Sequence, residues 1–277
     1  MKASVIIPVY NAVRHLELVL AGFGRQTFAD FELIVADDGS GPEMRQFVDA
    51  FTQRSPFQMN YVFQPDEGFR KSRILNAAIR LAKTDYLVFS DGDCIPHRRF
   101  LEAHWAHREP RTILLGRRVK FGERISSQLT PDAVAAGALE KSPLRRLLGA
   151  MVSDGSHWDE GVYLRSAWLR KLISRKAPYM LGSTYSLEKS LVEEINGFNE
   201  EFVGYGGEDI EFECRLRLAG ARFKWVRHQA IQYHLHHAQK VETPGNAELV
   251  QKSKALGRAA CAKGLRSLET SEPAPKT

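Results

Sequence analysis

The sequence has no apolar run that approaches the roughly 20 residues of a membrane-spanning helix. Its first residues, MKASVIIPVYN, lack the long apolar core and the small-residue cleavage site of a secretory signal. Its cysteines, Cys94, Cys214 and Cys261, are an odd set without zinc-site spacing, so we expect free thiols. These absences predict a cytoplasmic protein in a reducing compartment.

Several nucleotide and metal motifs are also missing. The glycines form neither a Walker A loop nor the G-x-G-x-x-G pattern, which argues against a P-loop ATPase and a dinucleotide-binding enzyme. The triplet Asp91-Gly92-Asp93 does not open an EF-hand, because residue 95 is isoleucine and no glutamate closes the loop. The late histidines, which include His234 and His237, do not have the H-E-x-x-H spacing of zinc proteases.

The composition is that of a globular protein with a basic surface. Hydrophobic residues make up 43% and charged residues 26% of 277, and the net charge is +6. A positive charge favours anionic partners, such as nucleotide phosphates or an anionic membrane surface. The lysines and arginines are scattered rather than gathered with aromatics, so we expect no nucleic-acid partner.

Short apolar strands alternate with helical patterns in the first third of the chain. Strands are predicted at residues 4–9, 31–37, 59–64 and 85–90, and helices at 15–23, 42–51 and 72–82. This alternation predicts an α/β fold with a mostly parallel sheet flanked by helices. Ligands of such sheets bind beyond the carboxyl ends of the strands, where this chain has polar residues at 10–11, 37–38, 67–70 and 91–93.

Asp91 and Asp93 are the first strong signal of a site. Two carboxylates one glycine apart repel each other unless they lie at a wet turn or opposite a positive charge. Their oxygens would suit Mg²⁺ or Mn²⁺, whereas the simpler interpretation is a common Asp-Gly turn.

The loop GYGGED is the second signal, since its glycines leave room for a ligand and Glu208 and Asp209 follow at a helix start. These acids could serve as a general base or merely complement the helix dipole.

The middle of the chain contains two basic amphipathic segments, SPLRRLLGAMV (142–152) and YLRSAWLRKLISRK (163–176). One interpretation is a membrane-surface helix, which would mean peripheral contact with an anionic membrane at its inner face. The alternative is a core helix with a solvated basic face.

Four blocks of the sequence together resemble a family 2 glycosyltransferase of the GT-A fold. They are SVIIPVYN, ELIVADDGS, GFRKSRILNAAIRLAKTDYLVFSDGDCIP and NGFNEEFVGYGGEDIEFECRLRLAG, and the resemblance spans about residues 4–237. The last block is similar to the C-terminal part of galactosyltransferases and of bacterial chondroitin-type polymerases. The resemblance implies a nucleotide-sugar-binding half (1–120), an acceptor-binding and catalytic half of the same domain (121–240), and a C-terminal helix with a disordered tail (241–277).

The resemblance also assigns roles to individual residues. It implies a UDP-sugar donor and a Mn²⁺ or Mg²⁺ cofactor, with a nucleotide-sugar site at Pro8, Tyr10, Asp38, Gly68, Arg70, Arg73 and Asp91. It implies metal ligation by Asp93 and His234, with His237 as an alternative to His234. Asp209 would be the catalytic base, and the acceptor would contact Tyr205, Gly206, Gly207 and Glu208. Two departures from the family pattern are Tyr205, where relatives have tryptophan, and SRILN, where they have an Ala-Arg-Asn run.

The implied function is inverting, metal-dependent transfer of Gal, GalNAc, Glc or GlcNAc from a UDP-sugar to a hydroxyl of a glycan or lipid-linked acceptor. Bacterial surface polysaccharide or lipopolysaccharide synthesis is the expected setting. The sequence leaves two alternatives open. A sugar-nucleotidyltransferase would need a glycine-rich basic loop near the N-terminus, which SVIIPVYNAV does not contain. An inactive nucleotide-sugar or polysaccharide-binding protein would retain the fold without turnover.

Overall fold

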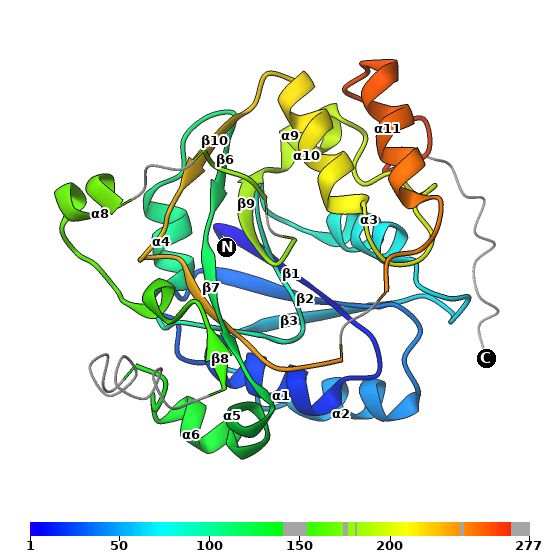
Figure 1. Ribbon diagram of the computed structural model, residues 1–277. Coiled ribbons are helices and arrows are strands. Elements are labelled where there is room, and N and C mark those ends of the chain that lie inside the picture. Colours follow the sequence, from blue (N-terminus) through cyan, green and yellow to red (C-terminus); the bar gives the residue numbers. More distant parts are fainter. Residues whose placement is uncertain (141–153, 174–176, 181, 239–240, 267–277) are drawn as a thin grey trace.

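A computed structural model describes residues 1–140, 154–173, 177–180, 182–238 and 241–266 (Figure 1). The predicted alternation of strands and helices is confirmed in the first third of the chain. Its elements are β1 (Ala3–Val9), α1 (Val13–Phe23), β2 (Phe31–Asp37), α2 (Pro42–Thr52), β3 (Gln58–Phe63), α3 (Lys71–Leu81) and β4 (Tyr86–Ser90).

The rest of the chain is less regular. It contributes β5 (Cys94–Pro96), α4 (Phe100–Ala106), β6 (Thr112–Leu115), β7 (Arg117–Phe121), α5 (Glu123–Gln128), α6 (Pro131–Ala135), β8 (Gly155–Ser156), the 3₁₀ helix η1 (Trp158–Gly161), α8 (Ala167–Ile173), β9 (Thr184–Glu188), α9 (Lys189–Glu194), α10 (Glu208–Leu218), β10 (Arg222–Trp225), β11 (Ile231–His234) and α11 (Asn246–Leu256). The predicted tail at 267–277 and the amphipathic segment at 142–152 lie outside the described residues. Among the described residues, no helix combines the length and apolarity required to cross a bilayer.

The strands form two sheets. The larger sheet has the order β10-β6-β9-β4-β1-β2-β3, and β9 is antiparallel to both of its neighbours while β1, β2, β3 and β4 are parallel. The smaller sheet has the order β5-β11-β7-β8 and begins immediately after Asp93. The fold is therefore the mostly parallel α/β architecture that the sequence predicted, with a second sheet beside the end of β4.

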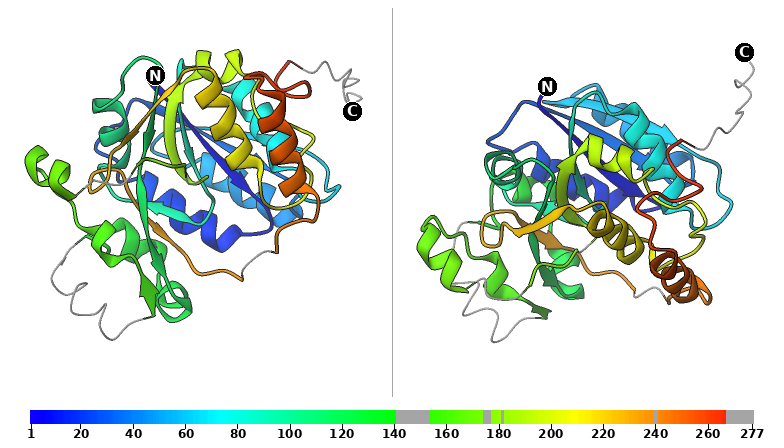
Figure 2. Two further views of the ribbon diagram at one scale, coloured as in Figure 1. Left: turned by 45° about the horizontal axis from the view of Figure 1, so that its top comes forward. Right: turned by 90° about the horizontal axis from the view of Figure 1, so that it is seen from above.

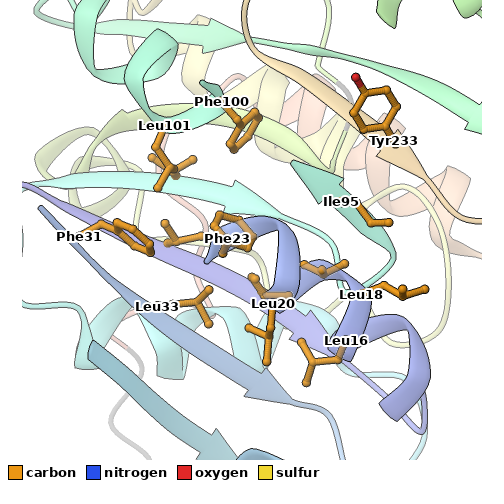
Figure 3. Close-up of a cluster of buried hydrophobic side chains, with 14 of the residues drawn as sticks. Leu16, Leu18, Leu20, Phe23, Phe31, Leu33, Ile95, Phe100, Leu101 and Tyr233 are labelled. Atoms are coloured by element: carbon orange, nitrogen blue, oxygen red, sulfur yellow. The ribbon is translucent and has the colours of Figure 1, made fainter. Parts of the chain in front are cut away.

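Helices cover both faces of the larger sheet because successive side chains of a strand point to opposite faces. Along β1, Val5 and Ile7 belong to the core under α1, whereas Ile6 belongs to the core under α3 and α10. Figure 3 shows the first of these cores, in which leucines of α1 pack against Phe31 and Leu33 of β2. Burial on both faces holds the strands rigidly, so their carboxyl ends can carry a precise site.

Candidate functional site

The site lies at the carboxyl ends of β1 and β4. Asp91, Gly92 and Asp93 follow β4 directly, and Gly92 packs against the end of β1. A Cβ at Gly92 would lie 2.9 Å from Val9 Cγ1 and 3.1 Å from the Pro8 carbonyl oxygen. Only glycine fits this approach without a shift of β1, so the middle residue of the triplet positions the two carboxylates on either side of it.

Lys71, in the first turn of α3, supplies the positive charge that the paired aspartates require. Its Nζ lies 3.7 Å from Asp91 Oδ1, 3.6 Å from Glu208 Oε1 and 3.8 Å from Asp209 Oδ2. Burial by itself would lower the pKa of Lys71, but the carboxylates of Asp209, Asp91 and Glu208 raise it well above its usual value. Lys71 therefore stays charged and joins two acidic segments that are more than 100 residues apart in the sequence.

Asp209 has the chemistry of a proton acceptor near neutral pH. Burial, together with the negative charges of Glu208 and Asp91, raises its pKa to about 6 against the opposing effect of Lys71. Its Oδ1 has no hydrogen-bond partner among the described residues. A Cβ at Gly182 would overlap Asp209 Oδ2, so the glycine leaves the space that the carboxylate occupies.

Asp93 faces two histidines at the other side of the triplet. Its Oδ2 lies 3.7 Å from His234 Nε2 and 3.2 Å from His237 Nε2, and the two imidazole nitrogens are 3.3 Å apart. Although burial would raise the pKa of Asp93, the hydrogen bond from His237 lowers it well below its usual range. Burial lowers the pKa of His234 to about 4, so its ring is neutral and can offer a lone pair.

Two further side chains border this cluster and were not predicted from the sequence. Cys94, a free and fully buried thiol, donates a hydrogen bond to Asp93 Oδ1 at a sulfur–oxygen distance of 3.3 Å. Arg118 on β7 donates to Ser183 Oγ at 2.8 Å, and the negative charges of Asp91 and Asp93 act on it. The local sequence gives no reason to prefer Arg118 to its neighbour Arg117 as a site residue. Arg118 comes to the site because β7 pairs with β11.

The predicted nucleotide side of the site is built from the ends of β1 and β2. Tyr10 is exposed and donates a hydrogen bond to Asp66 Oδ2 at 2.9 Å. Asp38 is buried and accepts hydrogen bonds from Gln64 Nε2 and from the Arg70 backbone amide. Asp38 thereby holds the loop that leads into α3 at Arg70, the residue before Lys71.

The basic turn at the start of α3 contains three residues that the resemblance assigns to the nucleotide sugar, Gly68, Arg70 and Arg73. The Arg70 guanidinium bonds to Glu67 and donates to the Pro65 carbonyl oxygen at 3.0 Å, so its charge is already paired. Gly68 lies in the turn with a φ of +85°, and Arg73 lies in the first turn of α3. Lys71, the next residue after Arg70, forms the ion pair with Asp91 that connects this turn to the acidic cluster.

The glycine-rich loop before α10 closes over the same edge. The Gly204 amide donates to the Phe69 carbonyl oxygen at 2.8 Å, and Tyr205 packs edge-to-face on Phe69 at 5.9 Å. Gly206 and Gly207 have φ values of +98° and +90°, a conformation that favours glycine. The loop therefore delivers Glu208 and Asp209 to Lys71 and leaves the Tyr205 ring partly exposed.

Comparisons with known proteins agree with this architecture. A family model described as glycosyl transferase family 2 matches residues 4–152, and a model described as the N-terminal domain of galactosyltransferase matches residues 171–238. The structure of S. aureus TarS 1–349 in complex with UDP-GlcNAc is similar with a TM-score of 0.61 at 19% identity, over 93% of this chain and 66% of that one. The mostly parallel α/β fold is thus similar to GT-A glycosyltransferase structures such as TarS. The chain belongs to glycosyl transferase family 2.

Curated relatives are longer than this chain. Validoxylamine A glucosyltransferase of Streptomyces hygroscopicus subsp. jinggangensis is 30% identical over 226 residues, which cover 78% of this chain and 51% of that protein. Chondroitin synthase of Escherichia coli is 27% identical over 239 residues, which cover 83% of this chain and 34% of that protein. The chain thus spans about half of the first relative and about a third of the second.

Proposed function

We propose that this protein is an inverting, metal-dependent glycosyltransferase that moves a hexose or N-acetylhexosamine from a UDP-sugar to an acceptor hydroxyl. The observation that carries the proposal is the convergence of two acidic segments on Lys71, beside the Asp93–histidine cluster. We assign residues 1–120 to the nucleotide sugar and residues 121–240 to the acceptor and the catalytic base.

The cluster of Asp93, His234 and His237 fits a divalent ion. Two ligands that bind one such ion side by side, each at about 2.1 Å, are themselves about 3 Å apart. The three separations between Asp93 Oδ2 and the two Nε2 atoms are 3.2, 3.3 and 3.7 Å, and a carboxylate with imidazoles is a donor set for Mn²⁺. An ion held by these residues would stabilise the negative charge that develops on the leaving diphosphate.

The chain's own residues account for the remaining steps of transfer. Asp209 accepts the proton from the acceptor hydroxyl as that oxygen bonds to the anomeric carbon of the donor sugar. The bond from the anomeric carbon to the diphosphate breaks on the opposite face, and UDP leaves with its electron pair, so the configuration inverts. Lys71 keeps Asp209 partly ionised and holds it beside Asp91, which orients the base towards the donor.

The relatives support a nucleotide-sugar donor and a glycan acceptor. A similar solved structure contains UDP-GlcNAc, and chondroitin synthase is among the curated relatives. We therefore propose Gal, GalNAc, Glc or GlcNAc as the transferred sugar, with surface polysaccharide or lipopolysaccharide synthesis as the setting. Tyr205, Gly206, Gly207 and Glu208 would meet the acceptor sugar, whereas Pro8, Tyr10 and Asp38 would meet the nucleotide.

Release of UDP from a panel of UDP-sugars tests this function. We expect one donor to be turned over with Mn²⁺, no turnover with EDTA, and losses of at least about 100-fold in Asp93→Ala and Asp209→Asn. Asp49→Asn is the matched control, because Asp49 is an exposed carboxylate on α2 that pairs only with Arg45 among the described residues. Metal-dependent UDP binding without turnover of any donor would favour the nucleotide-sugar-binding alternative.

A lipid-linked acceptor at the inner membrane face is a finer part of the proposal. In all three ribbon views α8 projects from the side of the fold (Figure 1, Figure 2). Trp168 on this helix is 70% exposed and Leu169 is also exposed, next to the basic residues Arg165 and Arg170. We expect the protein to float with anionic liposomes at low salt and Trp168→Ala to float less. Equal flotation of both proteins, or none at low salt, would argue against membrane contact through α8.

A further inference from the structure

Two aromatic side chains enclose an arginine beside the acceptor half of the site. The rings of Tyr179 and Trp225 meet edge-to-face with centroids 5.4 Å apart, and the Arg117 guanidinium carbon lies 5.4 Å from each ring centroid. Arg117 Nη1 also donates a hydrogen bond to the Tyr179 hydroxyl at 2.8 Å. Tyr179 nevertheless remains 45% exposed. A flat apolar ring is therefore presented to solvent next to a fixed hydrogen-bond donor.

Arg117 is held from behind by a buried ion pair. Its Nε lies 3.2 Å from Glu160 Oε1, and Glu160 is only 2% exposed. Arg227 binds the same carboxylate, so two positive charges share one negative charge. The guanidinium is thus preorganised, and the cluster keeps a net positive charge that suits hydroxyl oxygens or a carboxylate.

The segment that carries Tyr179 is fastened to α10, the helix of the catalytic base. The Met180 amide donates to Glu213 Oε2 at 2.8 Å, and Arg217 Nη2 donates to the Pro178 carbonyl oxygen at 2.9 Å. Gly182 then packs directly against Asp209. Three residues of extended chain span at most about 10–11 Å, so the Tyr179 backbone lies within that distance of Gly182.

The sheet topology brings Trp225 to the same edge as the acidic site. Trp225 is the last residue of β10, which is parallel to β6, and both β6 and β4 are antiparallel to β9. The carboxyl end of β10 therefore points the same way as the carboxyl end of β4, which leads to Asp91. The aromatic cluster lies on the β10 side of this edge, and the nucleotide residues of β1 and β2 lie on the other side of β4.

We propose that Tyr179, Trp225 and Arg117 form a second sugar subsite for an acceptor glycan, next to the sugar whose hydroxyl meets Asp209. This inference rests on the proposed function, because it assigns the cluster to the acceptor of that reaction. The exposed aromatic face stacks on the C–H face of a sugar ring, and Arg117 binds the ring's hydroxyl or carboxylate oxygens. The subsite makes the enzyme prefer an oligosaccharide acceptor to a single sugar.

Direct glycan binding tests the subsite without turnover. The probes are a hexasaccharide of alternating glucuronic acid and N-acetylhexosamine and a neutral hexasaccharide of N-acetylglucosamine, with binding followed by ligand-observed NMR. We expect Tyr179→Ala to weaken binding of at least one hexasaccharide about tenfold. Tyr179→Phe keeps the ring and loses only the hydroxyl, so it should bind within about twofold of the wild type. Leu218→Ala is the control, because it also removes an exposed apolar side chain, and it should bind the hexasaccharides normally.

UDP binding in the presence of Mn²⁺, measured on the same proteins, separates the two proposals. Loss of glycan binding in Tyr179→Ala with unchanged UDP binding supports the subsite. Equal glycan binding by Tyr179→Ala and the wild type, or binding of neither hexasaccharide by the wild type, would overturn the subsite. Absence of UDP binding in the wild type would instead count against the proposed function, whatever the glycan result.

Discussion

Lys71 Nζ lies 3.8 Å from Asp209 Oδ2, and it lies at nearly the same distance from Asp91 Oδ1. One cation from the start of α3 therefore joins the acidic triplet after β4 to the acidic start of α10. This arrangement resolves the electrostatic problem that the sequence poses at Asp91 and Asp93, since the positive charges of Lys71 and Arg118 and the hydrogen bond from His237 to Asp93 offset the repulsion. It also sets the protonation of the proposed base.

Replacement of Lys71 should move the acidic limb of the pH–rate profile. Asp209 acts as a base only when it is deprotonated, so activity should fall as the pH drops through about 6. Lys71→Met removes the charge that lowers the pKa of Asp209, so the limb should move to higher pH by at least about one unit. The profile of kcat/KM measures this shift. Lys83→Met, at an exposed lysine, is the control, and an unshifted limb in Lys71→Met would contradict this role.

Gly182→Ala should impair chemistry more than donor binding. The added Cβ overlaps Asp209 Oδ2 and forces the carboxylate to move. A displacement of about 1 Å can lower the reaction rate by roughly 100-fold. Steady-state kinetics should show a lower kcat with a nearly unchanged KM for the UDP-sugar. Gly24→Ala is a matched control, because its Cβ would have only ordinary contacts, the nearest at 3.5 Å. Equal activity of the two variants would show that the position of Asp209 is not critical.

Titration with Mn²⁺ can show which of the two candidate histidines binds the ion. His234→Ala and His237→Ala should each raise the Mn²⁺ concentration for half-maximal activity at least about tenfold, a loss seen even for outer-shell partners of metals. Mn²⁺ binding followed by electron paramagnetic resonance should weaken in parallel. His236→Ala controls for loss of an imidazole in the same segment, because His236 is exposed and contributes its backbone amide to a bond with Ser126. If only one variant changes, that histidine alone is the ligand.

A buried ion pair in α10 should contribute strongly to the stability of the fold. Arg215 Nε lies 2.8 Å from Glu211 Oε1, and each side chain is 1% exposed. Arg215→Ala leaves a buried carboxylate without its charge partner and should cost about 3–5 kcal/mol of the free energy of unfolding. The exposed pair of Arg45 and Asp49 on α2 is the control, and Arg45→Ala should cost less than about 1 kcal/mol. Urea denaturation measures both, and similar losses would contradict the assigned burial.

The sequence predicted the parts of the fold that local patterns determine. The first strands and helices have strong apolar periodicity, and their polar ends gather because parallel strands end at one edge. It did not predict that Thr184–Glu188 would form an antiparallel strand between β4 and β6, because this pairing depends on contacts about 70 to 100 residues away.

The same distinction applies to the site. Asp91, Asp93 and Asp209 stand in recognisable motifs, whereas Arg118 reaches the site only through the second sheet. Local sequence could not show that Arg70 pairs with Glu67 while Lys71 binds the acids, since both are basic residues in one turn. Side-chain direction within a turn is decided by packing, which a sequence pattern does not record.

Calorimetric titration with UDP measures the proposed nucleotide site by itself, because it needs no acceptor. We expect UDP to bind the wild type with Mn²⁺ and to bind at least about tenfold more weakly with EDTA or in Asp93→Asn. Asp209→Asn should bind UDP normally, since we propose that Asp209 serves the acceptor rather than the nucleotide. Equal affinity with Mn²⁺ and with EDTA, or no binding of UDP at all, would contradict the assignment of the Asp91–Asp93 edge as a metal-assisted nucleotide site.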